Sequence, residues 1–214
     1  MIENYLETYE YGIITSDFID STTTNSLSDK ILERESYIRG LNDGSKLRMN
    51  IVNHSNITNY HTYYNLIDLE IPEVDVLVSK IKELIYNAVG WENFHIKMWA
   101  NIFRKGDYLG LHKHMDNMSN KKFPYALSGH CFLYSSEKTC TTYLFKRKKT
   151  GIFDSSINVV DLPNVPGEVS IFSSYIEHEF KQWEGDLRVG IAFDINNEPD
   201  ANQNWLKTRQ FRYV

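Results

Sequence analysis

The chain has 214 residues, of which 42% are hydrophobic and 24% are charged, and its formal net charge is −5. These proportions are typical of a soluble globular protein and exclude a disordered chain. The acidic balance also argues against a nucleic-acid binder, which is usually basic. The length suits a single domain, 1–214, built around one core.

Cysteines and apolar runs restrict the class of protein further. The two cysteines, Cys131 and Cys140, form no CxxC pair and fit a reducing compartment. No apolar run reaches the length of about 18 residues that a membrane span needs, and the first residues lack the pattern of a secretory signal. We therefore expect a cytoplasmic protein, and the Asn- and Ile-rich composition fits an AT-rich viral or bacterial genome.

The first part of the chain, 1–95, is predicted to be a helical and mixed region that supports the rest. A short strand is expected at Tyr11–Ile14. A helix should begin within Asn25–Lys30, where Ser and Asp side chains can accept hydrogen bonds from free backbone amides. Gly40 and Gly44 should end that segment.

The clearest helical pattern begins near Pro72, because proline suits the first turn, where its missing N–H is not needed. Gly90 should end this helix, and its apolar stripe should pack against a sheet. The stripe consists of residues spaced three and four positions apart: Val76, Leu77, Lys80, Ile81, Leu84, Ile85 and Ala88.

From residue 96 onward, short β-rich runs alternate with Gly, Pro and Asn turns, with no long helices between them to serve as parallel crossovers. This pattern predicts an antiparallel jelly-roll core over 96–196 and a C-terminal extension over 197–214. The expected strands are Ile96–Phe103, Tyr108–His114, Ala126–Ser135, Thr141–Phe145, Asn158–Leu162, Glu168–Phe172 and Arg188–Ile195.

A dense cluster, His112, His114 and Asp116, falls at alternate positions of one expected strand. Alternate residues of a strand share a face, so all three side chains can point into one barrel mouth. Two imidazoles and one carboxylate on one side of a metal form the facial triad of Fe(II) oxygenases. Short His clusters also arise by chance at surfaces, so this pattern alone is weak.

A later pair, His178 and Arg188, strengthens the metal hypothesis. His178 ends a strand-like run and is the candidate third ligand, and Arg188 follows ten positions later. A guanidinium can bind a carboxylate through two parallel hydrogen bonds, which suits the far end of a small diacid held on the metal. The alternative for Arg188 is an ordinary surface ion pair with Glu184 or Asp186.

The order of these motifs resembles a known family. Gly106 precedes His112 by six positions, Ser128–Tyr134 fits an SG-x-x-x-x-Y strand, and Pro166–Phe172 fits the PG-hydrophobic run before a distal histidine. Together they resemble the 2-oxoglutarate/Fe(II)-dependent oxygenase superfamily, and more narrowly its prolyl-hydroxylase-like members. The resemblance covers about residues 97–195 and leaves out the N-terminal half.

This resemblance implies a mainly β fold with flanking helices, the double-stranded β-helix (jelly roll, cupin-like). It also implies Fe(II), the co-substrate 2-oxoglutarate and O2. The expected activity is that of a dioxygenase that hydroxylates a C–H bond of a peptide, a protein residue or a small metabolite. His178 and two of the upstream candidates would then hold iron, while Arg188 holds the far carboxylate.

Two registers compete for the upstream ligands. The spacing from Gly106 favours His112 as the first ligand and puts His114 where a carboxylate usually stands. The literal HxD pattern favours His114 and Asp116, and the usual ligand set of such irons favours this register. We prefer the HxD register and keep all three residues as candidates, one of which is not a ligand. The insertion Met118–Phe123 adds to the ambiguity of the register.

Tyr134 and Asn101 are candidate further contacts to the co-substrate, although a core role is equally compatible with each. Relatives often carry Ser or Thr two positions after the arginine, and Gly190 stands there instead, so that contact should be absent.

Two alternative functions stay open at this point. One is a cupin-type metal enzyme with three His ligands that does not use 2-oxoglutarate, and the other is a non-catalytic jelly-roll binding or structural module. The expected partner is a small-molecule or peptide substrate, with no nucleic acid and no membrane. No sequence pattern indicates the identity of the substrate or the oligomeric state.

Overall fold

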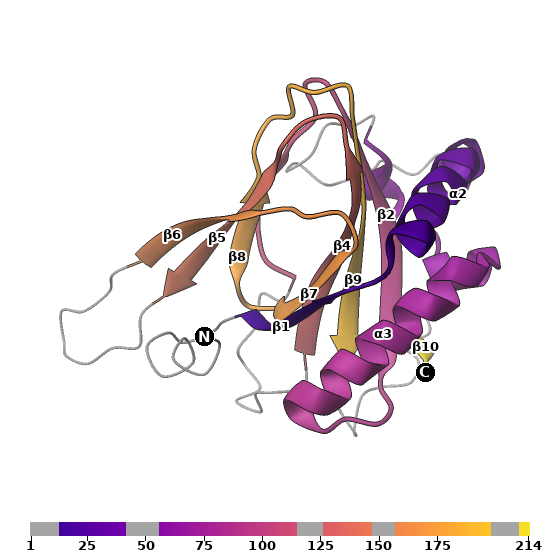
Figure 1. The fold of residues 1–214 in the computed structure, drawn as a ribbon, viewed down its shortest axis with the longest axis vertical. Helices are drawn as coiled ribbons and strands as arrows, with labels where there is room; N and C mark the ends of the chain where they lie inside the picture. The colour runs from indigo at the N-terminus through magenta and orange to yellow at the C-terminus, as the bar shows by residue number, and fades with distance from the viewer. Residues whose placement is uncertain (1–12, 42–55, 115–125, 147–156, 198–209) are drawn as a thin grey trace.

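The computed structural model describes residues 13–41, 56–114, 126–146, 157–197 and 210–214. Within them, two antiparallel sheets form a jelly roll, and two helices lie together on one side of it (Figure 1). The elements are β1 (Ile13–Phe18), α2 (Ser21–Gly40), η1 (Ile57–Tyr60), η2 (Leu66–Leu69), α3 (Pro72–Val89), β2 (His95–Arg104), β3 (Leu109–His112), β4 (Ala126–Ser135), β5 (Cys140–Lys146), β6 (Ile157–Pro163), β7 (Glu168–Ser173), β8 (Glu177–Phe180), β9 (Leu187–Asn196) and β10 (Arg212–Tyr213).

The larger sheet has the strand order β1-β7-β4-β9-β2-β10, and the smaller one has the order β3-β8-β5-β6. Every strand pair is antiparallel. This architecture confirms the predicted double-stranded β-helix with flanking helices. No helix in the described part of the chain is both long enough and apolar enough to cross a membrane.

Helix α2 begins earlier than the sequence suggested. The Asp20 side chain accepts a hydrogen bond from the Thr23 backbone N–H at 2.9 Å, so the helix starts at Ser21 rather than within Asn25–Lys30. Its predicted end at Gly40 is confirmed. The first strand is also displaced, because β1 covers Ile13–Phe18, whereas the start of the predicted strand lies outside the described residues.

Helix α3 begins at Pro72, and Gly90 caps its C-terminus in the left-handed conformation (φ 74°), as predicted. Two members of the predicted stripe are wrong: Val76 is 46% exposed, and Ala88 is exposed as well. The helix packs instead through Val74, Leu77, Ile81, Leu84 and Ile85.

The strand predictions from β2 to β9 are confirmed to within two residues at either end, apart from β8. The run that ends in His178 does not continue as one strand, because the chain turns after Ser173 and crosses to the smaller sheet. The turn is closed by the Ile176 backbone N–H, which donates to the Ser173 carbonyl at 3.0 Å. His178 therefore belongs to β8.

Alternation along β2 and β9, two neighbouring strands of the larger sheet, separates the apolar core from a polar cavity. Ile96, Met98, Ala100 and Ile102 belong to the same apolar cluster as the helices. Between them, Lys97, Trp99, Asn101 and Phe103 line a cavity of about 470 Å³. On β9, Arg188, Ala192, Asp194 and Asn196 line this cavity, and Ile195 also reaches it.

The segment from Asn56 to Leu66 covers the outer edge of β2 with side chains instead of a long strand. Asn65 donates to the Ile96 carbonyl at 3.1 Å and accepts from the Met98 backbone N–H at 3.2 Å. The Tyr64 hydroxyl accepts from the Ala100 backbone N–H at 2.8 Å. These contacts satisfy the backbone groups of an edge that would otherwise be open. They also fix the segment beside the cavity.

The apolar face of α3 can be tested with two substitutions on the same helix. Ile81→Ala removes a fully buried side chain, and we expect a loss of about 2–5 kcal/mol in the free energy of unfolding. Val76→Ala, on the exposed face, should change that free energy by less than about 0.5 kcal/mol. Urea denaturation followed by circular dichroism measures both variants. Equal losses for the two would contradict the packing described here.

Candidate metal centre and its pocket

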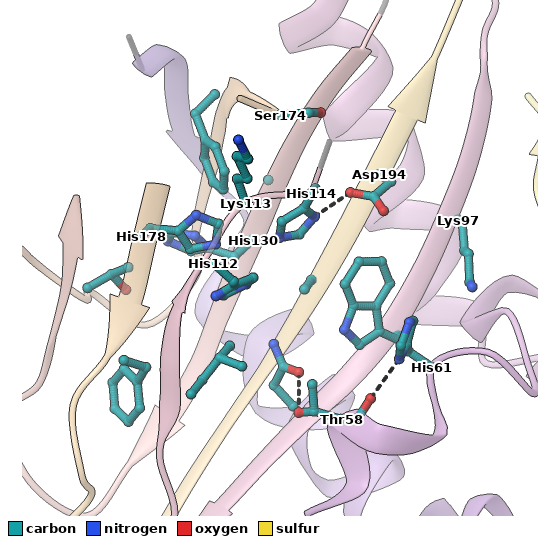
Figure 2. A pocket seen from close by; sticks show the side chains of 18 of the residues that line it. Thr58, His61, Lys97, His112, Lys113, His114, His130, Ser174, His178 and Asp194 are labelled. Carbon is teal, nitrogen blue, oxygen red and sulfur yellow. Dashed lines mark hydrogen bonds and ion pairs between the residues drawn. The ribbon is translucent and has the colours of Figure 1, made fainter. Parts of the chain in front are cut away.

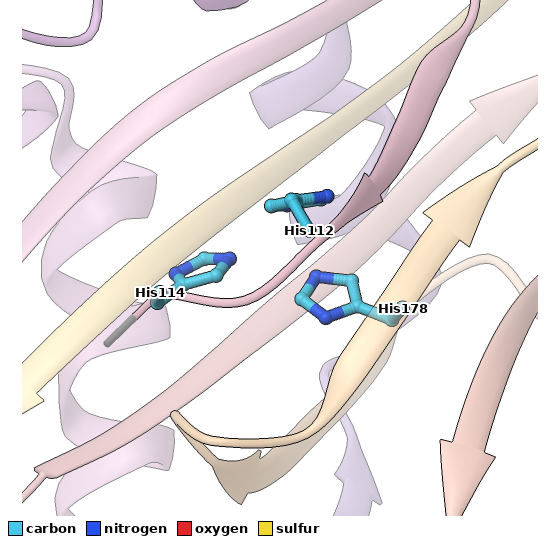
Figure 3. A group of neighbouring side chains, drawn as sticks. All are labelled: His112, His114 and His178. Carbon is cyan, nitrogen blue, oxygen red and sulfur yellow. The ribbon is translucent and has the colours of Figure 1, made fainter. Parts of the chain in front are cut away.

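Three histidine side chains converge inside the cavity (Figures 2 and 3). His112 ends β3 and lies directly opposite His178 on β8, and His114 follows just beyond β3. One ring nitrogen from each lies within 4.8 Å of the others. The backbone N–H of His114 donates to the Ser174 carbonyl at 3.1 Å, which fixes the position of the chain after β3. The arrangement has the geometry of a three-coordinate face around one metal ion.

Hydrogen bonds select the same tautomer for each of the three rings. His112 Nδ1 lies 2.9 Å from the Gly110 carbonyl oxygen, and His178 Nδ1 lies 3.1 Å from that of Ile176. A carbonyl oxygen only accepts, so Nδ1 carries the proton in both rings. His114 Nδ1 lies 2.5 Å from Asp194 Oδ1. Each Nε2 is therefore left with a lone pair for a metal.

Burial keeps two of these rings neutral. It lowers the pKa of His112 to about 4, and the neighbouring His114 adds to this effect. It also moves the pKa of His178 well below the ordinary value, with further contributions from His112 and His114. Neutral imidazole is the form that binds a metal, so the pocket holds these two ligands ready at neutral pH.

The ligand register that the structure brings together differs from the one that the HxD pattern favours. His112, His114 and His178 form the cluster, and Asp116 lies outside the described residues, as does the insertion Met118–Phe123. His112 was the ligand predicted by its spacing from Gly106. Among the described residues, no carboxylate joins the three imidazoles as a ligand.

A carboxylate does lie directly behind His114. Asp194 Oδ1 accepts from His114 Nδ1 at 2.5 Å (Figure 2). The same oxygen accepts from Ser128 Oγ at 2.8 Å. Ser128 also shares a hydrogen bond of 2.7 Å with Ser174. Burial alone raises the pKa of Asp194, but the charge of His114 and the hydrogen bonds from His114 and Ser128 outweigh it and hold the pKa below its usual value.

Arg188 is a buried cation in the same cavity. It is 7% exposed, its Nε has no hydrogen-bond partner, and no carboxylate of the described residues pairs with it. The surface ion pair with Glu184 or Asp186, considered as an alternative, is therefore not found within the described chain. The guanidinium lies among aromatic rings, 3.8 Å from the centre of Phe180. Burial lowers its pKa to about 9.

The place of Arg188 relative to the histidines follows from β8. His178 and Phe180 point to the same side of this strand, and Arg188 lies over Phe180. Two residues along a strand span about 7 Å. Arg188 therefore lies beside the position on β8 that comes two residues after His178.

The two further contacts predicted from sequence fall in different places. Asn101 lines the cavity and accepts from Thr58 Oγ1 at 2.7 Å. Tyr134 is 44% exposed and is not among the cavity residues. A bulge in β4 between Phe132 and Tyr134 changes the alternation, so Tyr134 faces solvent. The Nδ1 atom of His130 lies 3.2 Å from the Tyr143 hydroxyl, and this ring is outside the histidine cluster.

Comparison with solved structures gives the same architecture. A prolyl-4-hydroxylase from Pseudomonas putida aligns with a TM-score of 0.59 at 12% identity, over 92% of this chain and 97% of that one. SnoN, a non-heme alpha-ketoglutarate-dependent epimerase from nogalamycin biosynthesis, aligns with a TM-score of 0.61 at 11% identity, over 96% and 84%. A viral collagen prolyl hydroxylase from Paramecium bursaria Chlorella virus-1, solved with 2-oxoglutarate, aligns with a TM-score of 0.54 at 12% identity, over 88% and 96%. At these identities the likeness establishes the fold.

The chain has the fold of the 2-oxoglutarate/Fe(II)-dependent oxygenases. This confirms, at the level of the fold, the resemblance that the sequence motifs indicated. No protein-family model and no curated protein matches the sequence significantly.

One wall of the pocket in this oxygenase fold was missed by the sequence analysis. His61, from the segment that covers β2, and Lys97 lie across the cavity from His178 (Figure 2). His61 Nδ1 donates to the Thr58 carbonyl at 3.0 Å, which leaves Nε2 as an acceptor. In the sequence, the only indication that Lys97 lines the cavity is its spacing of two positions from Trp99. No sequence pattern indicates the same for His61.

The buried histidines predict how stability depends on pH. Burial lowers the pKa of His61 to about 4 and that of His130 to about 3. The unfolded chain takes up protons below about pH 6.5, whereas the folded chain resists them. The free energy of unfolding of the metal-free protein should therefore fall as the pH drops from 6.5 towards 4. The loss is up to about 1.4 kcal/mol per buried histidine and pH unit.

Urea denaturation at a series of pH values measures this slope. His61→Gln removes one such group and should give a shallower slope than the wild type. A free energy of unfolding that does not change over this range, or the same slope in both proteins, would contradict the burial of neutral histidines.

Proposed function

We propose that this chain is a 2-oxoglutarate- and Fe(II)-dependent dioxygenase that hydroxylates a C–H bond of a peptide, a protein residue or a small metabolite. The observation that carries the proposal is the pairing of two features in one cavity. A cluster of three imidazoles faces it, and a buried arginine without a carboxylate partner among the described residues lines it. The fold alone does not specify an activity.

The donor set fits iron. Imidazole suits Fe(II), and three ligands on one side leave the other positions open for co-substrate and O2. We propose His112, His114 and His178 as the ligands. The tautomer of each ring is already fixed by its Nδ1 contact, so little reorganisation accompanies metal binding.

The environment of Arg188 fits the far carboxylate of 2-oxoglutarate. A buried charge without a counter-ion is costly, and a dianionic ligand removes that cost. The aromatic rings around the guanidinium exclude water, which strengthens its interaction with a carboxylate. Asn101 lies on the same wall and is a candidate further contact, whereas the exposure of Tyr134 argues against that role for it.

Different residues of the pocket have different roles in this proposal. The three imidazoles hold Fe(II), which with 2-oxoglutarate and O2 supplies the oxidising chemistry needed to attack a C–H bond. Arg188 and the surrounding rings orient the diacid and keep that end of the pocket dry. The wall formed by His61, Trp99 and Lys97 lies on the remaining side, where a substrate can approach. The solved structures with this fold include enzymes named for prolyl hydroxylation and for epimerisation, so both peptide and small-molecule substrates stay in the proposal.

The three-histidine set also favours one competitor, a cupin-type metal enzyme that does not use 2-oxoglutarate. Arg188 speaks against it, since that chemistry has no need of a buried cation in the pocket. A non-catalytic jelly-roll module needs neither the fixed tautomers nor the unpaired guanidinium.

Anaerobic addition of Fe(II) and 2-oxoglutarate distinguishes these functions. We expect the weak visible absorption of an iron–2-oxoglutarate chelate and, after O2 is admitted, formation of succinate even without the primary substrate. EDTA should abolish both. Iron binding without any response to 2-oxoglutarate would favour the cupin-type enzyme, and no metal binding at all would favour the binding module.

Arg188 can be tested separately from the metal. Arg188→Met removes a buried charge, so the protein without ligands should be at least as stable as the wild type. Its affinity for 2-oxoglutarate should fall by about 2–5 kcal/mol while Mn(II) binding is retained. Calorimetric titration of the Mn(II)-loaded wild type and variant with 2-oxoglutarate measures the loss of affinity. Titration of the two metal-free proteins with Mn(II) checks that metal binding is retained.

Lys181→Met is the matched control, because Lys181 lies just after β8 and its side chain is 62% exposed. This variant should bind 2-oxoglutarate like the wild type. If Arg188→Met binds 2-oxoglutarate normally, the role assigned to Arg188 is wrong.

A further inference from the structure

We propose that Asp194 is a positioning residue that supplies, from behind His114, the negative charge that a carboxylate ligand gives to a usual facial triad. The inference rests on the proposed function insofar as His114 is taken as an iron ligand. It goes further in explaining how a site with three imidazoles can replace two imidazoles and a carboxylate.

The first observation is that the three ligand rings are not equivalent. The Nδ1 groups of His112 and His178 donate to backbone carbonyls, each two residues earlier in the chain. Both acceptors are neutral: Gly110 lies in β3 with His112, and Ile176 comes directly before β8, which carries His178. His114 alone donates to a carboxylate, and that carboxylate comes from a different sheet, on β9.

The second observation is that Asp194 is itself held firmly. Ser128 on β4 donates to the same oxygen at 2.8 Å and is linked to Ser174 at 2.7 Å. The carbonyl of Ser174 in turn accepts from the backbone N–H of His114 at 3.1 Å. The ring and the backbone of His114 are thus fixed by one connected network that spans both sheets.

The third observation concerns sequence position. His114 stands two residues after His112, which is where a facial triad has its carboxylate. A carboxylate that accepts from a ligand's Nδ1–H fixes the ring and raises the basicity of its Nε2. The charge therefore acts on the metal through one imidazole rather than by direct coordination. This compensates in part for the charge that a histidine at this position removes.

Lys97 is paired with Asp194 across β2 and β9, and the two side chains interact electrostatically. Removing the charge of Asp194 therefore alters both the ligand and the electrostatics of the pocket. A test has to separate the effect that passes through His114 from a general change of potential.

Asp194→Asn keeps the shape of the side chain and removes its charge. We expect the metal-free protein with this change to bind Co(II) and Mn(II) about 10–100-fold more weakly than the wild type, measured without 2-oxoglutarate. The absorption spectrum of bound Co(II) should also change, since a merely structural role would leave the ligand field alone. Ser128→Ala, which removes the other donor and keeps the charge, is the control and should weaken binding less.

A double-mutant cycle with His114→Asp isolates the pathway. This change puts a carboxylate directly on the metal and breaks the link to Asp194. In that background, Asp194→Asn should cost no further metal affinity. An equal loss in both backgrounds would show a general field effect and overturn the proposal, as would unchanged affinity in the single Asp194→Asn variant. If the single Asp194→Asn variant does not fold, the comparison of His114→Asp with the double variant still distinguishes an effect through His114 from a general field effect.

Failure of this inference and failure of the proposed function give different results. Succinate formation by the wild type together with unaltered metal binding in Asp194→Asn would refute only the role of Asp194. Metal binding that depends on Asp194, with no response to 2-oxoglutarate, would refute only the dioxygenase.

Discussion

The site depends on one constraint, the strict alternation of side chains along β2 and β9. In the middle of a sheet, every second residue must face the same side, so one strand can serve an apolar core and a polar cavity together. On β9, Val189, Ile191, Phe193 and Ile195 anchor the sheet to the apolar core. The residues between them are then free to carry charge. Because the apolar half fixes the register, the polar half is placed in the cavity, where Asp194 accepts hydrogen bonds from His114 and Ser128.

This arrangement buries two kinds of charged group that differ in how they are balanced. Asp194 is surrounded by donors, and its pKa is held low by them despite its burial. Arg188 has aromatic rings around it and no counter-ion among the described residues, and burial lowers its pKa. A balanced charge stabilises the structure that holds it, whereas an unbalanced one destabilises the empty protein and favours an anionic ligand. The same sheet therefore contains a carboxylate that neighbouring donors balance and a cation that no described carboxylate balances.

The sequence was sufficient for the fold because its signals were local. Strand alternation, Pro72 and Gly90 each act within a few residues. The structure supplies the reason for two glycines that the motifs contain: a methyl group at Gly129 would lie 2.3 Å from the Phe193 ring, and Gly167 adopts φ +87° next to the Ile19 carbonyl. The crossing of the chain after Ser173 was missed, because no residue pattern there differs from a continuing strand. The link from Asp194 to His114 spans 80 positions and two sheets, and only the three-dimensional pairing reveals it.

The N-terminal segment has a role that no motif encodes. Its side chains form hydrogen bonds with the backbone groups at the open edge of β2. The sheet requires these hydrogen bonds, whereas catalysis does not. The same contacts place His61 at the cavity, on the side away from Arg188's aromatic surroundings. The residues that we propose to bind metal and diacid lie on β3, β8 and β9 and just beyond β3, and this part of the opposite wall comes from the edge cover. Such a cover can change in sequence as long as it still satisfies the edge, so selectivity for a substrate can diverge while the metal centre stays fixed.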